Sequence, residues 1–121
     1  MNILVTGGNG FLGRHVIASL LAQDNCKVTC LIRLGSQLNG LPEDKITVIR
    51  GSLNNLDDIK TALKGVDTVI HLAASMGGSP MGMFIETVVS TEILMSVLSE
   101  SPVKRLVFCS SFSVYGASQL N

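Results

Sequence analysis

Four glycines lie close together near the N-terminus, where a short apolar stretch gives way to a helix-like apolar stripe. In one alignment, Gly8, Gly10 and Gly13 match the pattern G-x-G-x-x-G. In the other, Gly7 replaces Gly8 and the pattern is G-x-x-G-x-x-G. Glycine permits a tight strand-to-helix turn, and it lets a pyrophosphate approach the backbone at a helix N-terminus. The context of strand, turn and helix therefore predicts a dinucleotide-binding turn. We expect its cofactor-binding residues to be Gly7, Gly10, Phe11, Leu12 and Gly13.

The second candidate position for cofactor chemistry is the end of the next predicted strand. An NAD site commonly places an acidic residue there to bind the ribose 2′-hydroxyl. This chain has no acidic residue between Asp24 and Glu43, and it has Arg33 at the expected position, with Ser36 close behind. A guanidinium can bind a 2′-phosphate through two hydrogen bonds, or it can stack on the adenine. We expect Arg33 and Ser36 to bind the cofactor and favour NADP, with NAD as the alternative.

The elements that must position these residues alternate along the chain. Apolar runs rich in β-branched residues predict strands, and apolar residues at helical spacing predict the segments between them. We expect a polar loop, without a helix, between the second and third strands, and another loop at residues 75–83. This order predicts an α/β fold of the Rossmann type, with a parallel sheet of strand order 3-2-1-4-5 that is truncated after the fifth strand. The predicted strands are residues 3–5, 27–32, 46–49, 66–72 and 106–108.

Composition limits the classes of partner. Nine Lys and Arg balance nine Asp and Glu, which gives no electrostatic basis for binding nucleic acid or an anionic membrane. No uninterrupted apolar run approaches the length of a membrane span, and no signal peptide precedes the first strand, so we expect a cytoplasmic protein. The three cysteines form no metal or disulfide pattern; we expect Cys30 and Cys109 to be buried core residues.

Four segments together resemble the extended short-chain dehydrogenases/reductases, the group that contains nucleotide-sugar epimerases and dehydratases. The glycine turn at residues 6–13 is similar to that family's glycine motif, and Gly-Ser-Leu at residues 51–53 is similar to its Gly-Asp-Leu. His-Leu-Ala-Ala at residues 71–74 matches its fourth-strand motif, and residues 110–116 contain its Ser-Ser-x-x-Val-Tyr-Gly. The resemblance implies that residues 1–121 form one NAD(P)-binding Rossmann domain. It adds these cofactor-binding residues: Ser52, Leu53, Leu72, Ala73 and Ala74.

The same resemblance implies a catalytic role for Ser111, whose hydroxyl would hydrogen-bond the reacting oxygen of the substrate. Thr87 and Ser90 stand where the family usually has Asn and Gly. The family's catalytic Tyr-x-x-x-Lys would lie beyond Asn121. We therefore expect this chain to be an N-terminal portion that is inactive alone. His71 is expected to be a buried structural residue.

Two functions follow as hypotheses. In the first, the chain is the dinucleotide-binding portion of an NAD(P)-dependent epimerase, dehydratase or reductase. That enzyme would transfer hydride to or from a small-molecule substrate such as a nucleotide sugar or a related alcohol or carbonyl compound. In the alternative, it is a non-catalytic NAD(P)-binding sensor or scaffold. Because the fifth strand would expose an unpaired apolar edge, we also expect self-association.

Overall fold

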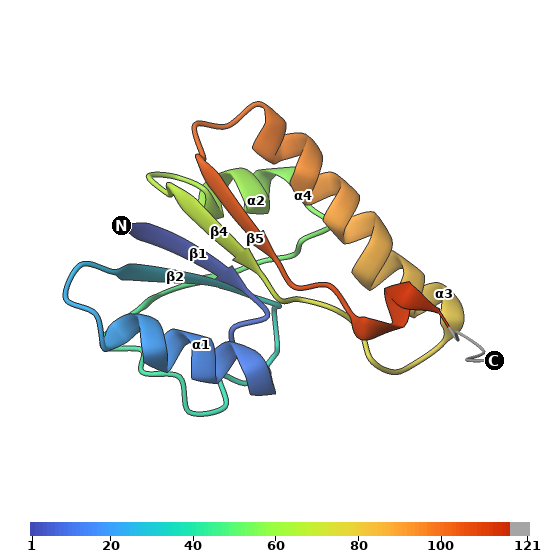
Figure 1. The fold of residues 1–121 in the computed structure, drawn as a ribbon, viewed down its shortest axis with the longest axis horizontal. Coiled ribbons are helices and arrows are strands. Elements are labelled where there is room, and N and C mark those ends of the chain that lie inside the picture. Colours follow the sequence, from blue (N-terminus) through green and yellow to red (C-terminus); the bar gives the residue numbers. More distant parts are fainter. Residues whose placement is uncertain (117–121) are drawn as a thin grey trace.

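A five-stranded parallel sheet forms the centre of the molecule, in the order β3-β2-β1-β4-β5. The computed structural model describes residues 1–116. This topology confirms the predicted order 3-2-1-4-5, and the strand boundaries differ only slightly from those expected (Figure 1). The strands are β1 (Asn2–Thr6), β2 (Lys27–Ile32), β3 (Thr47–Arg50), β4 (Thr68–His71) and β5 (Arg105–Phe108).

Helices cover both faces of the sheet, α1 on one side and α2 with α4 on the other (Figure 1). Side chains of β1 alternate between these layers, because successive residues of a strand point to opposite faces. Ile3 and Val5 pack in the core cluster that includes Ile17 of α1, whereas Leu4 packs with Ile59 and Leu94 on the other face. The helices are α1 (Phe11–Leu21), α2 (Leu56–Ala62), α3 (Pro80–Phe84), the π-helical turn η1 (Ile85–Val89), α4 (Ser90–Ser99) and the 3-10 helix η2 (Phe112–Tyr115).

The loop expected at residues 75–83 is shorter than predicted, because a helix already begins at Pro80. The Ser79 hydroxyl accepts a hydrogen bond from the Gly82 N–H at 3.0 Å, and Pro80 occupies a position in the first turn where its missing N–H has no cost. α3, η1 and α4 then run on as one helix to Ser99.

That continuous helix, Pro80–Ser99, has 20 residues and a mean hydropathy of 1.5, so it is long and apolar enough to cross a membrane. Counting uninterrupted apolar residues missed this property, because Glu86 and Glu92 interrupt the run. Only 11% of its apolar window is buried. One such helix is weak evidence for a membrane span, because a helix covered by other protein has the same composition.

Cys109 is exposed, which makes the prediction that it is buried wrong. It follows β5, which pairs only with β4 among the described residues, and Val107 and Phe108 of that strand are 47% and 52% exposed. Burial of Cys109 would therefore need a covering layer that residues 1–116 do not provide. Cys30 lies in the inner strand β2 and is fully buried, as predicted, and this burial raises the pKa of its thiol to about 12.

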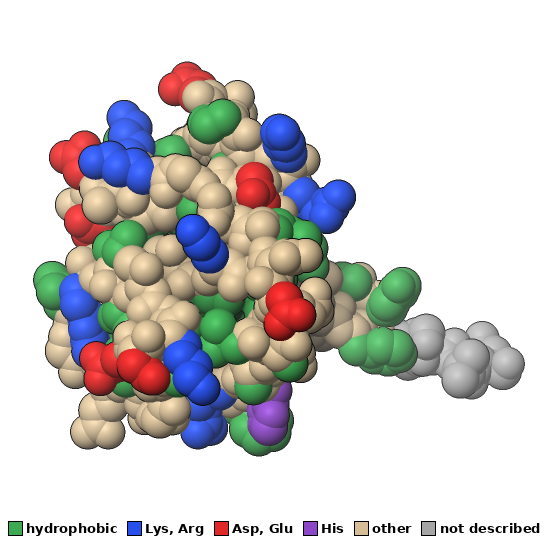
Figure 2. Space-filling model, turned by 90° about the vertical axis from the view of Figure 1, so that its left-hand side faces the viewer, with side chains coloured by type: hydrophobic (Ala, Val, Ile, Leu, Met, Phe, Trp, Pro, Cys, Tyr) green, Lys and Arg blue, Asp and Glu red, His purple; other side chains and the backbone are tan. Residues whose placement is uncertain are grey.

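Charges of both signs are interspersed on the face of the molecule that Figure 2 shows, in keeping with the zero net charge. Among the described residues, no group of three or more His, Cys, Asp or Glu is placed to hold a metal ion.

Candidate functional site

The turn after β1 brings the chain directly into helix α1. Gly7 has a φ of 70°, a left-handed conformation that favours glycine. The Gly10 N–H donates to the Gly7 carbonyl at 3.1 Å, which closes the turn. Gly10 is the N-cap of α1, and no side chain caps this helix end. The N–H groups of the first helical turn are therefore available to an anion, in a position where the helix dipole favours negative charge.

Glycine is needed at each position of this turn for a different structural reason. A Cβ on Gly13 would lie 2.1 Å from the Gly7 carbonyl oxygen, and one on Gly7 would lie 2.8 Å from the Ala73 nitrogen. These two glycines permit the close packing of helix, turn and neighbouring strand. A Cβ on Gly10 would meet only the Gly7 oxygen, at 3.3 Å. Gly7 and Gly10 line the cavity described next, whereas Gly8 does not. The spacing that starts at Gly7 therefore describes the turn better than the one that starts at Gly8.

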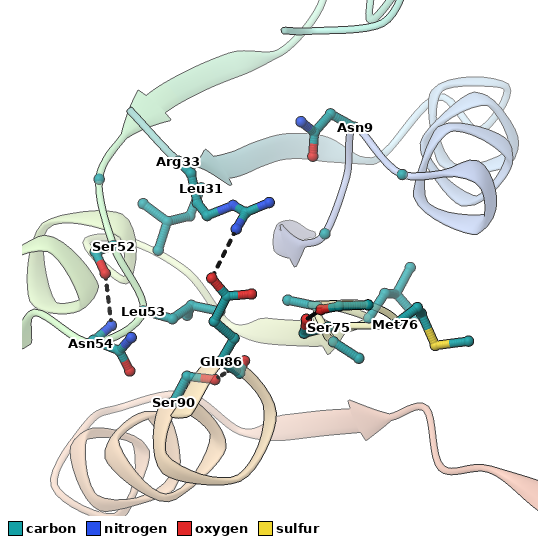
Figure 3. A pocket seen from close by; sticks show the side chains of 17 residues that line it. Asn9, Leu31, Arg33, Ser52, Leu53, Asn54, Ser75, Met76, Glu86 and Ser90 are labelled. Atoms are coloured by element: carbon teal, nitrogen blue, oxygen red, sulfur yellow. Dashed lines mark hydrogen bonds and ion pairs between the residues drawn. The ribbon is translucent and has the colours of Figure 1, made fainter. Parts of the chain in front are cut away.

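A cavity of about 610 Å³ opens at the carboxyl ends of the strands. In a doubly wound parallel sheet, this is the edge at which ligands bind, and the volume is in the range of small-molecule sites. Its wall combines residues from the glycine turn, the segments after β2, β3 and β4, and the long helix (Figure 3). The residues expected to bind cofactor that lie in this wall are Gly7, Gly10, Arg33, Ser52, Leu53, Leu72, Ala73 and Ala74.

The other expected site residues lie outside the cavity wall. Phe11 and Leu12 are exposed at the start of α1, and Gly13 is buried against the turn. The Ser36 carbonyl accepts a hydrogen bond from the Arg50 guanidinium, so Ser36 helps to shape the loop after β2. Ser111 lies beyond β5, where its hydroxyl caps η2 by accepting from the Ser113 N–H at 3.2 Å.

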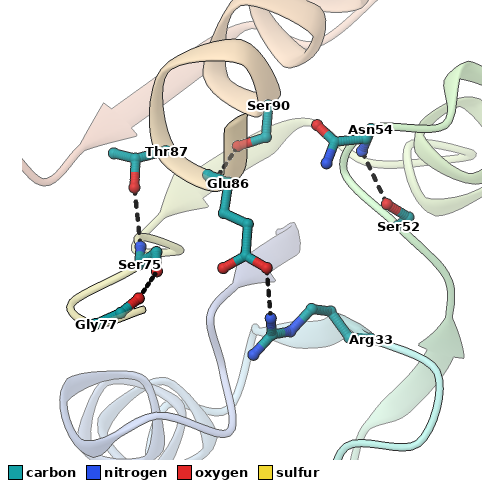
Figure 4. A network of polar contacts seen from close by, with 8 residues as sticks. All are labelled: Arg33, Ser52, Asn54, Ser75, Gly77, Glu86, Thr87 and Ser90. Carbon is teal, nitrogen blue, oxygen red and sulfur yellow. Dashed lines mark hydrogen bonds and ion pairs between the residues drawn. The ribbon is translucent and has the colours of Figure 1, made fainter. Parts of the chain in front are cut away.

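Sequence reasoning missed several residues of the wall. The most informative is Glu86 of η1, which forms an ion pair with Arg33: Nη1 of Arg33 donates to Oε1 of Glu86 at 3.2 Å. Figures 3 and 4 show the two side chains pointing toward one another, from the residue that follows β2 and from the helix. The residues are 53 positions apart, so no local motif could have found the pair. The other wall residues that we did not predict are Asn9, Leu31, Gly51, Asn54, Ser75, Met76, Gly77 and Ser90.

A group of hydrogen bonds holds the loop after β4 against η1. The Ser75 N–H donates to the Thr87 hydroxyl at 2.9 Å, and the Ser75 hydroxyl donates to the Gly77 carbonyl at 3.0 Å (Figure 4). Thr87 stands where the resemblance led us to expect Asn, and here its hydroxyl fixes the backbone of a cavity-lining residue. The Ser90 hydroxyl donates to the Glu86 carbonyl at 2.6 Å within the helix.

His71 connects β1 to helix α4. Its Nδ1 lies 2.7 Å from the Thr6 hydroxyl, and its Nε2 lies 3.0 Å from the Thr91 hydroxyl. The same Thr6 oxygen accepts from the N–H groups of Leu72 and Ala73, both at 3.2 Å. The histidine is buried, which lowers its pKa because the charged form is desolvated. The prediction of a buried structural histidine is therefore confirmed.

The chain matches known proteins along nearly its whole length. Residues 3–120 match the family described as the NAD dependent epimerase/dehydratase family. A UDP-glucose 4-epimerase of Halalkalibacterium halodurans is 36% identical over 124 residues, which cover 96% of this chain and 36% of that protein. A 3-beta-hydroxysteroid dehydrogenase of Mycolicibacterium neoaurum is 33% identical over 126 residues, which cover 97% and 34%. The chain thus spans about a third of the length of these curated relatives.

Solved structures agree with the observed fold. A short-chain dehydrogenase/reductase superfamily protein from Agrobacterium tumefaciens with bound NAD is similar with a TM-score of 0.80 and 34% identity, over 96% of this chain and 34% of that chain. A dTDP-glucose 4,6-dehydratase from Bacillus anthracis in complex with NAD is similar with a TM-score of 0.84 and 25% identity, over 100% of this chain and 41% of that one. The glycine turn, the strand order and the match over residues 3–120 lead to one conclusion: the chain belongs to the NAD-dependent epimerase/dehydratase family.

Proposed function

We propose that residues 1–121 form the NAD(P)-binding domain of an enzyme that moves hydride between the cofactor and a substrate carbon. The substrate class that we favour is a nucleotide sugar or a related alcohol or carbonyl compound. The observation that carries the proposal is the cavity at the carboxyl edge of the sheet, into which the glycine turn and the uncapped N-terminus of α1 open. The name of the epimerase relative supports the choice of substrate class.

The residues of the cavity fit the parts of a dinucleotide. Gly10 has no side chain to fill the space in front of the helix end, so a pyrophosphate can accept hydrogen bonds from the first-turn N–H groups. Leu31 and Leu53 provide apolar surface at the side of the cavity near Arg33, as an adenine requires. The backbone of Leu72 and Ala73 continues the wall and is held by the Thr6 hydroxyl.

Arg33 is the residue that we propose for the 2′-phosphate of NADP. Its guanidinium lies in the cavity wall and its side chain is 71% exposed, so it can reorient toward a ligand. The solved structures described above contain NAD, and the domain is therefore proposed to bind NAD as well.

Ser111 is the residue that we propose for the reaction itself. The bound nicotinamide supplies the hydride acceptor or donor. The Ser111 hydroxyl is exposed and lies 2.8 Å from the Ser113 hydroxyl, so it can exchange this partner for a substrate oxygen. By donating a hydrogen bond it would stabilise negative charge that develops on that oxygen.

The test is calorimetric titration of the chain and of Gly10→Val with NAD and NADP. We expect the native chain to bind and the variant to lose binding of both nucleotides, because its side chain occupies the approach of the pyrophosphate. Thermal unfolding of both proteins tests whether the variant is folded. Equal binding by a folded Gly10→Val would refute the assignment of the glycine turn. The sensor or scaffold function would be favoured instead if a longer protein that contains this chain binds the dinucleotides but turns over no nucleotide sugar, alcohol or carbonyl compound.

A further inference from the structure

The ion pair between Arg33 and Glu86 places an acidic side chain where the end of β2 has none. Within the described part of the chain, Glu86 is the only acidic residue in the cavity wall and Arg33 is the only basic one. We infer that Glu86 is a nucleotide-selectivity residue, which opposes the 2′-phosphate of NADP and favours the free ribose hydroxyls of NAD. This inference rests on the proposed dinucleotide function of the same cavity.

A 2′-phosphate would compete with Glu86 for Arg33. The guanidinium can bind a phosphate through two parallel hydrogen bonds only if its donors are free. In the structure, Nη1 already donates to Oε1 of Glu86 at 3.2 Å. A 2′-phosphate must therefore displace the carboxylate or share the guanidinium with it, and both options reduce the gain that Arg33 alone would provide.

The Glu86 carboxylate would also repel a 2′-phosphate directly. The Glu86 side chain is 46% exposed and points toward Arg33 across the cavity (Figure 4). A phosphate that reaches Arg33 would also come close to this carboxylate. For a carboxylate and a doubly charged phosphate about 6 Å apart in a water-like dielectric, the repulsion corresponds to about a tenfold loss of affinity.

Glu86 also has an oxygen that could bind the unphosphorylated ribose. Oε1 of Glu86 binds Arg33, and Oε2 has no hydrogen-bond partner among residues 1–116. A carboxylate oxygen accepts a hydrogen bond from a ribose hydroxyl, which is the interaction that an acidic residue at the end of the second strand usually makes. Here the acid comes from the opposite wall, and Arg33 holds it in place.

The local backbone supports this assignment. Glu86 lies in η1, a π-helical turn between two α-helical segments, and such turns occur frequently at functional sites. Its carbonyl accepts from the Ser90 hydroxyl at 2.6 Å, and the next residue, Thr87, accepts from the Ser75 N–H. Contacts on both sides therefore fix the stretch of helix that carries the carboxylate.

The test compares the affinities for NADP and NAD, and those for 2′,5′-ADP and 5′-AMP, in the native chain and in Glu86→Gln. Glutamine keeps the shape and removes the charge. We expect the ratio of NADP to NAD affinity, and that of 2′,5′-ADP to 5′-AMP, to rise about tenfold, as the electrostatic argument requires. Glu92→Gln is the matched control, because Glu92 is exposed on the same helix and lies outside the cavity wall; it should leave both ratios unchanged.

The outcomes distinguish a failure of the Glu86 inference from a failure of the proposed function. If native chain and Glu86→Gln bind both dinucleotides with the same affinity ratio, the inference about Glu86 is overturned and the proposed function stands. A rise of the same size in Glu92→Gln would also overturn it, because the effect would then come from net charge alone. If the native chain binds neither dinucleotide, the proposed function fails and the inference fails with it.

Discussion

Replacing Gly13 with alanine should destabilise the protein, although Gly13 lies inside a helix where alanine is normally the better residue. The structure determines which effect dominates. In a helix interior, alanine is more favourable than glycine by about 1 kcal/mol. Against this gain, the new Cβ would lie 2.1 Å from the Gly7 carbonyl oxygen and 2.7 Å from the Gly8 Cα. Both are backbone atoms, so no side-chain rotation can relieve the overlap.

The size of the effect follows from the shift that the contact demands. To restore an ordinary separation, α1 must move away from the turn by about 1 Å, which disturbs the packing of Ile17 in the core on that side. Forced overpacking of this kind costs about 3 kcal/mol. Net of the helix propensity, we expect Gly13→Ala to lower the free energy of unfolding by about 2 kcal/mol. For a domain of this size, that corresponds to a decrease of about 6–10 °C in Tm.

Thermal and urea unfolding, followed by circular dichroism, measure this difference. Gly77→Ala is the control, because a Cβ at Gly77 would meet no atom within 4 Å and its φ is not in the left-handed range. We expect that variant to unfold within a degree or two of the native chain, as surface substitutions generally do. A Tm of Gly13→Ala at or above the native value would show that α1 does not approach the turn as closely as described.

Three further predictions test other parts of the structure. Arg33→Ala should weaken NADP binding by at most about 1.5–3 kcal/mol, the usual contribution of a charged hydrogen bond, because Glu86 shares the guanidinium; calorimetry that shows an equal loss for NAD would mean that Arg33 does not contact the phosphate. Burial lowers the pKa of His71 below that of the unfolded chain. The neutral, buried His71 should therefore contribute its full stabilisation above about pH 6.5, and this contribution should decrease as the pH falls toward the lower pKa of the folded state. Equal free energies of urea unfolding at pH 7.5 and 5.5 would contradict this. His15→Gln is the control for the other histidine. The chain should self-associate through β5 or the exposed apolar face of Pro80–Ser99, and sedimentation that gives a monomer at every concentration would refute this.

Much of the fold could be predicted because it depends on short-range patterns. Alternation in β1 separates Val5 from Leu4 and so defines the two core layers, and right-handed crossovers then leave few possible strand orders. The glycine turn was found for the same reason, since Gly7 and Gly10 are neighbours in sequence and in space. Even the missed helix start had a local signal: Ser79 followed by Pro80 is a typical N-cap and first-turn pair.

The remaining features depend on contacts between distant segments. Cys109 was expected to be buried because strands of parallel sheets usually are, but its burial depends on a neighbour beyond β5 and not on the residue type. The position of Ser111 depends on the path that the chain takes after β5. The resemblance suggested a catalytic role for Ser111, whereas its position outside the cavity wall could not be predicted from that motif.

The proposed cofactor selectivity illustrates why such contacts matter. From the sequence alone, Arg33 after β2 favours NADP, because no acidic residue is nearby along the chain. The opposite wall of the cavity comes from the helix that contains Glu86, however, and its carboxylate neutralises the guanidinium on which that inference depends. We therefore expect the preference for one nucleotide to be a property of the pair and not of the strand end. An arginine at this position favours a 2′-phosphate only to the extent that the facing helix leaves its charge free.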